Sequence, residues 1–322
     1  MRISASLPAG VTALLFDEVT RRRRFEKQAV TEFESRGFSE VILPILDYFE
    51  PYQSLLSSEL REELYRFVDR DGELLALRGD FTPMLARLLA PRLDALEMPL
   101  RFFYRGDLVR YQEERAGRLR EYYEIGAELL GLSGEEADEE MLELFLRLLQ
   151  PENGSRVRVI LGFAGALDGL LMKAAKGSRA ELARAVARRE RRAAADADSA
   201  LLEVVEEGVP GDARALGADA GADLDSLVAL CQRVQGRFDP ARVELNIDLA
   251  EFAENFVDPD LVAPAGQLPY YDGVVFRAYI DGGGQPVGRG GRYDRLFRRL
   301  GSSHAAVGFS ISVDPLLRDL SS

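Results

Sequence analysis

The sequence predicts an α+β fold in which an antiparallel sheet is flanked by helices. Segments with the alternating apolar pattern of strands recur between segments with helical periodicity, and they follow no fixed repeat length. Residues 100–111 and 118–130 have the pattern of two strands joined by one loop, which favours an antiparallel pair. Far along the chain, "VELNIDLAEF" again alternates apolar with polar residues, as a half-buried strand does. Strands that are distant in sequence are therefore expected to meet in one sheet.

Composition limits the classes of function that fit this chain. Its 322 residues, 47% of them hydrophobic, are enough to bury a large core. Acidic residues number 54 against 41 basic ones, and the net charge of -13 disfavours broad binding to a nucleic-acid backbone. Cys231 is the only cysteine, which excludes an intrachain disulfide and a cysteine-based zinc cluster. No segment has the apolar length of a signal peptide or a membrane span, so we expect a cytoplasmic protein.

The N-terminal part should alternate helices with strands. Residues 16–36 have helical periodicity and end before Gly37, which suits the left-handed end of a helix. The segment "SEVILPIL" follows as a strand, but Pro44 within it cannot donate a backbone hydrogen bond. We therefore expect this strand at a sheet edge or an interface. Further helices are expected at 81–96 and 135–149, and a further strand at 74–78.

Residues 163–236 differ in composition from the rest of the chain. Ala, Arg, Glu and Asp dominate there, and their helix propensity and interleaved charges favour helices. We expect a helical insertion at 163–236 within a core made of residues 1–162 and 237–322. In the second part of the core, strands are expected in "PYYDGVVFRAYI" and "HAAVGFSISV", and "GRGGRYDRLFRRL" is expected to be a glycine-rich turn leading into a helix.

Six arginines lie between positions 101 and 120, in and after the first of the paired strands. Alternate side chains of such a pair project from one face, so Arg110 and Glu124 can lie close together. A guanidinium donates two parallel hydrogen bonds to phosphate or carboxylate, which makes Arg110 a candidate anion ligand. The alternative is that these arginines form ion pairs with the acidic surface.

Other local patterns have both a functional and a structural interpretation. The glycines of "VGRGGRYDRL" either allow backbone amides to approach an anion or form a tight turn before a helix. Asp80 and Thr82 stand at a predicted helix start, where both residue types are common caps. His304 is the only histidine, which excludes a histidine-based metal cluster. We predict no metal site and no cofactor.

Taken together and in order, these segments resemble the catalytic core of class II aminoacyl-tRNA synthetases, and in particular histidyl-tRNA synthetase. "EVILPIL" resembles motif 1, which would place Pro44 at a dimer interface. Residues 107–131 resemble motif 2, and "AAVGFSISVDPLL" resembles motif 3. "PYYDGVVFRAY" and "GRGGRYDRL" resemble the two histidine-specific motifs. The resemblance covers nearly the whole chain outside 163–236 and implies the synthetase core fold.

The resemblance also implies a pocket for a histidine-like ligand. The positions assigned to it are Asp80 and Thr82 on the α-amino side, Glu124 and Glu128 on the amine and imidazole side, and Tyr270 and Tyr271 at the ring. A vestigial phosphate or nucleotide site is implied at Arg110, Gly290 and Gly291. Several acidic groups in one pocket suit a protonated amine or imidazolium.

The chain departs from the synthetase pattern at positions that carry the chemistry. Gly266 stands where the family has a catalytic arginine, and Pro269 replaces an aspartate. Pro315 stands in motif 3 where an arginine grips the γ-phosphate of ATP. Gln112 and Glu124 replace a glutamate and a glutamine of motif 2. Because removing one preorganised donor typically costs about 10²–10³ in rate, the chain is not expected to adenylate an amino acid.

A synthetase core with such losses resembles the family of ATP phosphoribosyltransferase regulatory subunits. The chain ends at Ser322, so we expect no C-terminal anticodon-binding domain and no tRNA partner. The resemblance implies a non-catalytic subunit that associates with the short-form catalytic subunit of ATP phosphoribosyltransferase. It acts at the first step of histidine biosynthesis and is linked to feedback inhibition by histidine, which is itself a candidate ligand. A dimer formed through motif 1 and no membrane partner are also implied.

Two alternative functions stay open at this point. One is a truncated synthetase-like ligase that adenylates histidine or another amine. The other is an amino-acid sensor that partners an unrelated protein.

Overall fold

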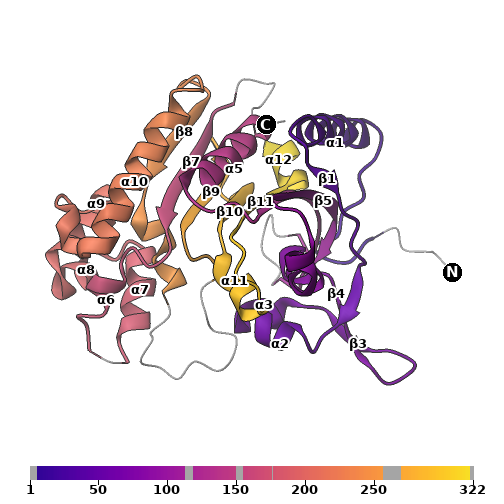
Figure 1. The fold of residues 1–322 in the computed structure, drawn as a ribbon, viewed down its shortest axis with the longest axis horizontal. Coiled ribbons are helices and arrows are strands. Elements are labelled where there is room, and N and C mark those ends of the chain that lie inside the picture. The colour runs from indigo at the N-terminus through magenta and orange to yellow at the C-terminus, as the bar shows by residue number, and fades with distance from the viewer. Residues whose placement is uncertain (1–5, 113–118, 150–154, 176, 257–269, 320–322) are drawn as a thin grey trace.

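The computed structural model describes residues 6–112, 119–149, 155–175, 177–256 and 270–319. Within these ranges, eight strands form one sheet and three short strands form another (Figure 1). In spatial order, the large sheet comprises β1 (Ser39–Glu40), β5 (Leu100–Val109), β6 (Glu121–Leu130), β11 (Ala306–Ser312), β10 (Gly288–Arg292), β9 (Val274–Ile280), β7 (Val157–Phe163) and β8 (Val243–Ile247). The small sheet comprises β2 (Leu46–Tyr48), β4 (Leu74–Leu77) and β3 (Arg66–Val68). The predicted α+β class is confirmed.

Long antiparallel strands build the centre of the large sheet. β5 and β6 pair along their whole lengths, from Leu100 opposite Leu130 to Val109 opposite Glu121. This confirms the expected pairing of the two segments, with β6 beginning three residues later than predicted. The described strand pairs of this sheet are antiparallel except β1 with β5 and β7 with β8, which are parallel.

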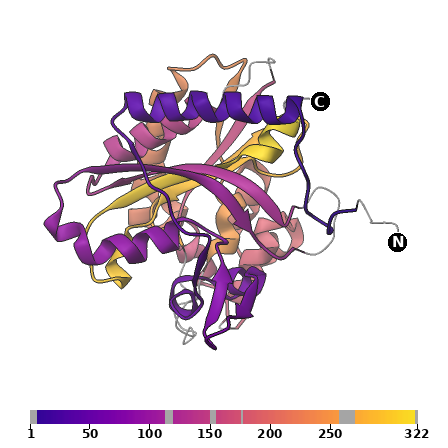
Figure 2. The same ribbon diagram turned by 90° about the vertical axis from the view of Figure 1, so that its right-hand side faces the viewer.

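One face of the large sheet is apolar and covered by helices. These are α1 (Asp17–Ser35), α5 (Glu135–Leu148), α10 (Ala218–Gln235) and α12 (Val313–Asp319), and Figure 2 shows α1 lying across the sheet. Phe33 of α1 stacks on Phe103 of β5 with ring centroids 4.9 Å apart, and Phe145 of α5 lies 5.0 Å from Phe276 of β9. Burying one such side chain stabilises the fold by roughly 1.5–3 kcal/mol.

The opposite face of the sheet carries polar and small side chains. One register row that crosses seven strands on this face comprises Tyr104, Gly126, Ser310, Arg289, Arg277, Ile160 and Asn246. Residues directly opposite each other on paired strands project from the same face. Beside it, α4 (Thr82–Leu89), the short helix η1 (Ala90–Ala95) and α11 (Asp294–Arg299) share a second apolar core. This polar face is where functional side chains can gather.

The segment between β7 and β8 is helical, as its composition predicts. It comprises α6 (Asp168–Leu171), α7 (Arg179–Ala187), α8 (Arg191–Ala197), α9 (Ser199–Glu207), η2 (Ala213–Leu216) and α10. These helices gather beside the β7–β8 end of the sheet (Figure 1). The Gln235 side chain of α10 exchanges two hydrogen bonds with β8, to the Val243 carbonyl and from the Leu245 amide. It therefore protects the outer edge of that strand. The division of the chain into a core and an insertion stays a prediction.

Two predicted elements differ from the structure. "SEVILPIL" does not form one strand, because its first two residues form β1 (Ser39–Glu40) and its last residue begins β2 (Leu46–Tyr48). Pro44 lacks an amide hydrogen, and the Arg78 guanidinium binds the Leu43 and Pro44 carbonyls at 2.5 and 3.1 Å in place of a neighbouring strand. The glycine-rich segment 288–292 is not a turn but the central strand β10.

The remaining short helices connect these layers. They are α2 (Tyr52–Leu55), α3 (Ser58–Glu63) and η3 (Leu249–Asn255). None of the helices in the described ranges combines the length and the apolar character that crossing a bilayer requires.

Candidate functional site

Glu128 lies at the centre of a hydroxyl-lined cluster on the polar face. Its carboxyl group accepts hydrogen bonds from Thr82 Oγ1 at 2.7 Å, from the Tyr104 hydroxyl at 3.3 Å and from the Tyr293 hydroxyl. Only 1% of the residue is exposed. Burial raises the pKa of Glu128 to about 8, although these hydroxyl groups favour the charged form. At neutral pH this carboxyl is therefore largely protonated.

A glycine on the neighbouring strand makes room for that carboxyl. Gly308 of β11 lies directly opposite Glu128 in the register. A Cβ at position 308 would lie 1.6 Å from Glu128 Oε2. The glycine of the motif-3 segment thus has a steric reason that the sequence analysis did not identify.

Asp80 links the start of α4 to Arg110. Its Oδ1 accepts a hydrogen bond from the Thr82 amide at 3.0 Å, as expected for a residue at a helix start. Its Oδ2 accepts one from Arg110 Nη2 at 3.2 Å, and Arg110 Nε donates to the Gly79 carbonyl at 2.5 Å. Arg110 is buried. Arg110, which was predicted to bind an anion, therefore already has a carboxylate partner within the protein.

Glu124 is the second buried acid of the cluster. It lies on the same strand and face as Glu128, four residues earlier on β6. Burial raises its pKa, Asp80 raises it further, and the guanidinium groups of Arg289 and Arg110 act in the opposite direction. The predicted proximity of Arg110 to Glu124 agrees with this electrostatic coupling.

Tyr270 and Tyr271 border the same cluster. Their rings meet edge to face with centroids 4.8 Å apart, and Tyr270 lies 5.7 Å from the Tyr293 ring. Both tyrosines are half-buried against the second apolar core. The structure thus brings the predicted acids, Thr82 and the two tyrosines together, and their ligand stays a prediction.

The glycines predicted to border a phosphate have a packing reason in the structure. A Cβ at Gly290 would lie 2.5 Å from the Phe276 ring and 2.6 Å from the Gly308 carbonyl. A Cβ at Gly291, whose φ is +156°, would lie 2.4 Å from the Val274 carbonyl. Close strand packing accounts for both residues, and a nucleotide role for them stays a prediction.

Arg289 of β10 is a functional candidate that the sequence analysis missed. Its Nη2 lies 3.8 Å from Asp80 Oδ2, and 42% of its side chain is exposed. Partial burial alone would lower the pKa of Arg289, but the carboxylates of Glu124 and Asp80 raise it above the ordinary arginine value. The residue was overlooked because 288–292 was interpreted as a turn. Strand alternation across "GRGGR" would have placed Arg289 on the polar face.

The arginines of the 101–120 region have separate partners. Arg101 binds Glu140 at 3.0 Å, and Arg105 binds Glu40 at 2.8 Å. Arg120 Nε donates to the Gln112 carbonyl at 3.1 Å. Arg115 and Arg118 lie outside the described residues. For Arg101 and Arg105, the ion-pair alternative is confirmed.

The remaining predicted positions lie apart from this cluster or outside the described residues. Pro44 is exposed beside the small sheet. Pro315 lies in α12, where the neighbouring Asp314 accepts a hydrogen bond from the Tyr123 amide at 2.9 Å. Gly266 and Pro269 belong to the segment that the structure does not describe. Within the described residues, no group of three or more His, Cys, Asp or Glu side chains is placed to hold a metal ion.

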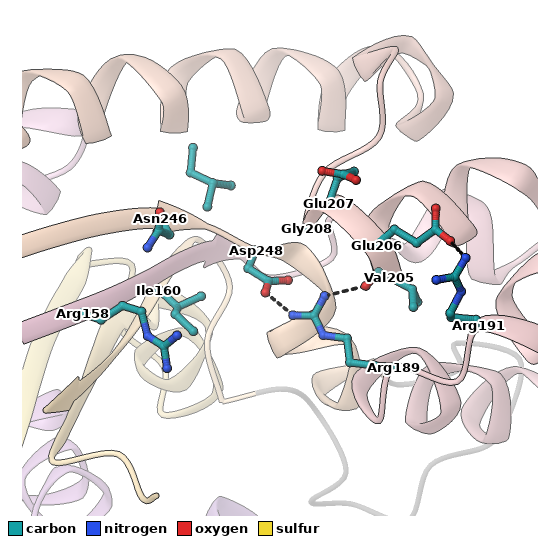
Figure 3. Close-up of a pocket in the computed structure, with 11 residues that line it drawn as sticks. Arg158, Ile160, Arg189, Arg191, Val205, Glu206, Glu207, Gly208, Asn246 and Asp248 are labelled. Carbon is teal, nitrogen blue, oxygen red and sulfur yellow. Dashed lines mark hydrogen bonds and ion pairs between the residues drawn. The ribbon is translucent and has the colours of Figure 1, made fainter. Parts of the chain in front are cut away.

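A separate cleft of about 790 Å³ lies at the β7–β8 end of the polar face (Figure 3). Arg158 and Ile160 of β7 and Asn246 of β8 line its sheet side. Across the cleft, Arg189 binds Asp248 and donates to the Val205 carbonyl at 3.1 Å. Since Arg289, Arg277, Ile160 and Asn246 share one register row, the cleft and the Glu128 cluster open on the same face of the sheet.

Comparison with known proteins places this fold in a class. The histidyl-tRNA synthetase family model matches residues 10–316. A structure of an ATP phosphoribosyltransferase regulatory subunit/histidyl-tRNA synthetase from Bacillus halodurans superposes with a TM-score of 0.80 at 24% identity, covering 99% of this chain and 84% of that one. The protein therefore has the class II synthetase-like core fold, as predicted.

Sequence similarity narrows the class to one family. The chain is 35% identical to the ATP phosphoribosyltransferase regulatory subunit of Anaeromyxobacter dehalogenans (strain 2CP-C), over 97% of this chain and 90% of that protein. A chain from an ATP phosphoribosyl transferase complex of Thermotoga maritima shares the fold with a TM-score of 0.66 at 19% identity, covering 91% of this chain and 97% of that one. The protein belongs to the family of ATP phosphoribosyltransferase regulatory subunits.

Proposed function

We propose that this protein is a non-catalytic regulatory subunit of ATP phosphoribosyltransferase and acts with a separate catalytic subunit at the first step of histidine biosynthesis. Family membership over almost the whole chain carries this proposal. The catalytic partner is a short-form ATP phosphoribosyltransferase subunit, and histidine is the feedback signal. The Thermotoga maritima complex, one chain of which shares this fold, supports an assembly of this kind.

The proposal excludes amino-acid adenylation by this chain. Gly266 has no side chain to bind an anion, and Pro315 has no donor for a γ-phosphate. In addition, Arg110 is engaged by Asp80 and Gly79. Each lost transition-state donor costs about 10²–10³ in rate. The alternative, a truncated synthetase-like ligase, needs cations at these positions.

The Glu128 cluster is proposed to keep a small-ligand site, with histidine as its candidate. Asp80 and Glu124 offer carboxylates for an amine, and Tyr270 and Tyr271 offer aromatic surface for an imidazole. The hydroxyl-bonded Glu128 carboxyl lies at the bottom of this arrangement, buried and largely uncharged.

Self-association is proposed to use the outer face of the small sheet. Strand register places Tyr48 opposite Leu75 and Phe67 opposite Leu75, so these apolar side chains share one face. Tyr48 is 56% exposed, and Ile42 in the motif-1 segment is 89% exposed. Other exposed apolar side chains of this surface are Ile45, Leu46 and Phe67. An apolar surface of this kind, next to the exposed Pro44, suits a second copy of the chain.

Reconstitution with the catalytic subunit from the same organism tests the proposed function. The two purified proteins should co-elute, and ATP phosphoribosyltransferase activity should require both. ATP–pyrophosphate exchange with histidine tests the ligase alternative in the same preparation. Exchange at a synthetase-like rate would favour the ligase, whereas co-elution with an unrelated protein from the native host would favour a sensor.

A further inference from the structure

We propose that Arg289 is the residue that binds the carboxylate of an amino-acid ligand, so that the Glu128 cluster selects zwitterions over amines without a carboxylate. This inference rests on the proposed small-ligand site and names the chemistry it recognises. Arg289 enters the cluster from β10, within the segment "GRGGRYDRL", whereas the synthetase pattern has its catalytic arginine at the position of Gly266.

The guanidinium of Arg289 is held more loosely than that of its neighbour. Arg110 Nη2 lies 3.2 Å from Asp80 Oδ2, whereas Arg289 Nη2 lies 3.8 Å from the same oxygen. Arg110 also donates to the Gly79 carbonyl. Among the described residues, no hydrogen bond from the Arg289 side chain is present, and 42% of that side chain is exposed. Apart from this 3.8 Å ion pair with Asp80, its N–H donors are available to bind a planar anion.

The arginine opposite Arg289 on the neighbouring strand is less available to bind a ligand anion. Arg277 of β9 lies directly opposite Arg289. Its guanidinium donates hydrogen bonds to the carboxylates of Glu251 at 3.2 Å and Glu254 at 3.0 Å, whereas the Arg289 guanidinium comes no closer than 3.8 Å to Asp80. Arg289 is thus the better placed of the two to receive a ligand anion.

The charges in the cluster favour a ligand of zero net charge. The guanidinium groups of Arg110 and Arg289 stand against the carboxyl groups of Asp80 and Glu124. A pure cation or a pure anion would leave one charge without a partner in a largely buried site, which is costly. A zwitterion preserves the balance. In an α-amino acid, the amine and the carboxylate are attached to the same carbon. They can therefore bind two protein groups that lie side by side, the carboxylate of Asp80 and the guanidinium of Arg289.

The test compares L-histidine with histamine, which has the same imidazole and amine but no carboxylate. Isothermal titration calorimetry on the full chain should show histidine binding roughly 10- to 100-fold more tightly than histamine. In R289A this preference should disappear, mainly through weaker histidine binding. R289Q should do the same with a side chain of closer size, and thermal unfolding of both variants checks that the fold is intact.

R158A is the matched control. Arg158 is an exposed arginine on the same face of the sheet, and it lines the separate cleft (Figure 3). Its removal changes the net charge equally, and the preference for histidine should stay as in the wild type. If R158A loses histidine binding while R289A keeps it, the ligand lies in the separate cleft and the proposal is wrong.

Other results would also overturn the inference. These are an unchanged histidine-to-histamine ratio in folded R289A and R289Q, equal wild-type affinities for the two compounds, or no binding of either. The proposed regulatory function fails separately. If the wild-type chain does not raise ATP phosphoribosyltransferase activity, that function is wrong, and activation that persists without histidine selectivity contradicts only the inference about Arg289.

Discussion

Gly308 of β11 and Glu128 of β6 face each other across two paired strands, and a single added methyl group at position 308 would overlap the carboxyl oxygen. Glu128 in turn accepts hydrogen bonds from Thr82 of α4, Tyr104 of β5 and Tyr293, which immediately precedes α11. The cluster therefore depends on a glycine that contributes no side chain to it.

Replacing that glycine should damage the cluster. G308A would push the Glu128 carboxyl away from its hydroxyl partners or separate the strands, and we expect a loss of roughly 2–4 kcal/mol in the free energy of unfolding. Urea unfolding monitored by circular dichroism measures it. G284A is the control, since a Cβ there meets nothing within 4 Å. A G308A protein as stable as G284A would contradict the packing described here.

The buried Glu128 should make stability depend on pH. Burial raises its pKa to about 8 in the folded protein, from an ordinary value of 4.5. Between these pH values, the folded state binds more protons than the unfolded state, so the free energy of unfolding should fall as the pH rises. E128Q removes this titration. Relative to the wild type, the variant should gain on the order of 3 kcal/mol between about pH 5 and pH 8.

Denaturant unfolding at both pH values measures this difference. E136Q, at an exposed position of α5, serves as the control and should follow the wild-type profile. Parallel pH profiles for E128Q and the wild type would show that Glu128 is not the titrating group.

Self-association should depend on the outer face of the small sheet. Y48E places a charge in a surface that is proposed to be buried between two copies, so the dimer should dissociate at micromolar concentrations. Light scattering after size-exclusion chromatography measures the mass. V19E on α1 also adds a charge at an exposed apolar residue, but outside this surface. A monomeric V19E and a dimeric Y48E would move the interface to α1.

Arg78 should be needed to hold the motif-1 segment. It donates to the carbonyls of Leu43, Pro44 and Asp107, and it lies over the Phe81 ring at 4.1 Å. R78M keeps much of the apolar stem but leaves three carbonyls without this donor. We expect a loss of roughly 2–4 kcal/mol in stability together with weaker dimerisation. Unchanged dimer affinity in a destabilised R78M protein would show that the Arg78 contacts stabilise the fold but do not support the dimer interface.

The parts of the fold that the sequence predicted correctly are those with a strong local pattern. Alternation identified β5, β6 and β8, and helical periodicity identified α1 and α5, because local repeats report directly on which face is buried. The prediction of one strand at 39–46 was wrong because Pro44 and the Arg78 contacts override the apolar pattern of this segment. The prediction of a turn at β10 was wrong because glycines usually signal turns. The reason for these glycines is close packing against Phe276 and Gly308 on the neighbouring strands.

In the candidate site, the residues predicted correctly are those that match a motif of the related family. Asp80, Thr82, Glu124 and Glu128 do lie together in the structure. Arg289 was missed although it lies in "GRGGRYDRL", because that segment was interpreted as a turn, and its proximity to Asp80 arises from the pairing of β10 with β11 and β9. Long-range register of this kind is not visible in a local pattern.

The most direct measurement of the central claim is ATP phosphoribosyltransferase activity of the catalytic subunit from the same organism as this chain is titrated in. Activity should rise and saturate at a fixed ratio of the two subunits, and this chain alone should have none. Activity that is unchanged at every ratio, with no co-elution of the two proteins, would contradict the account.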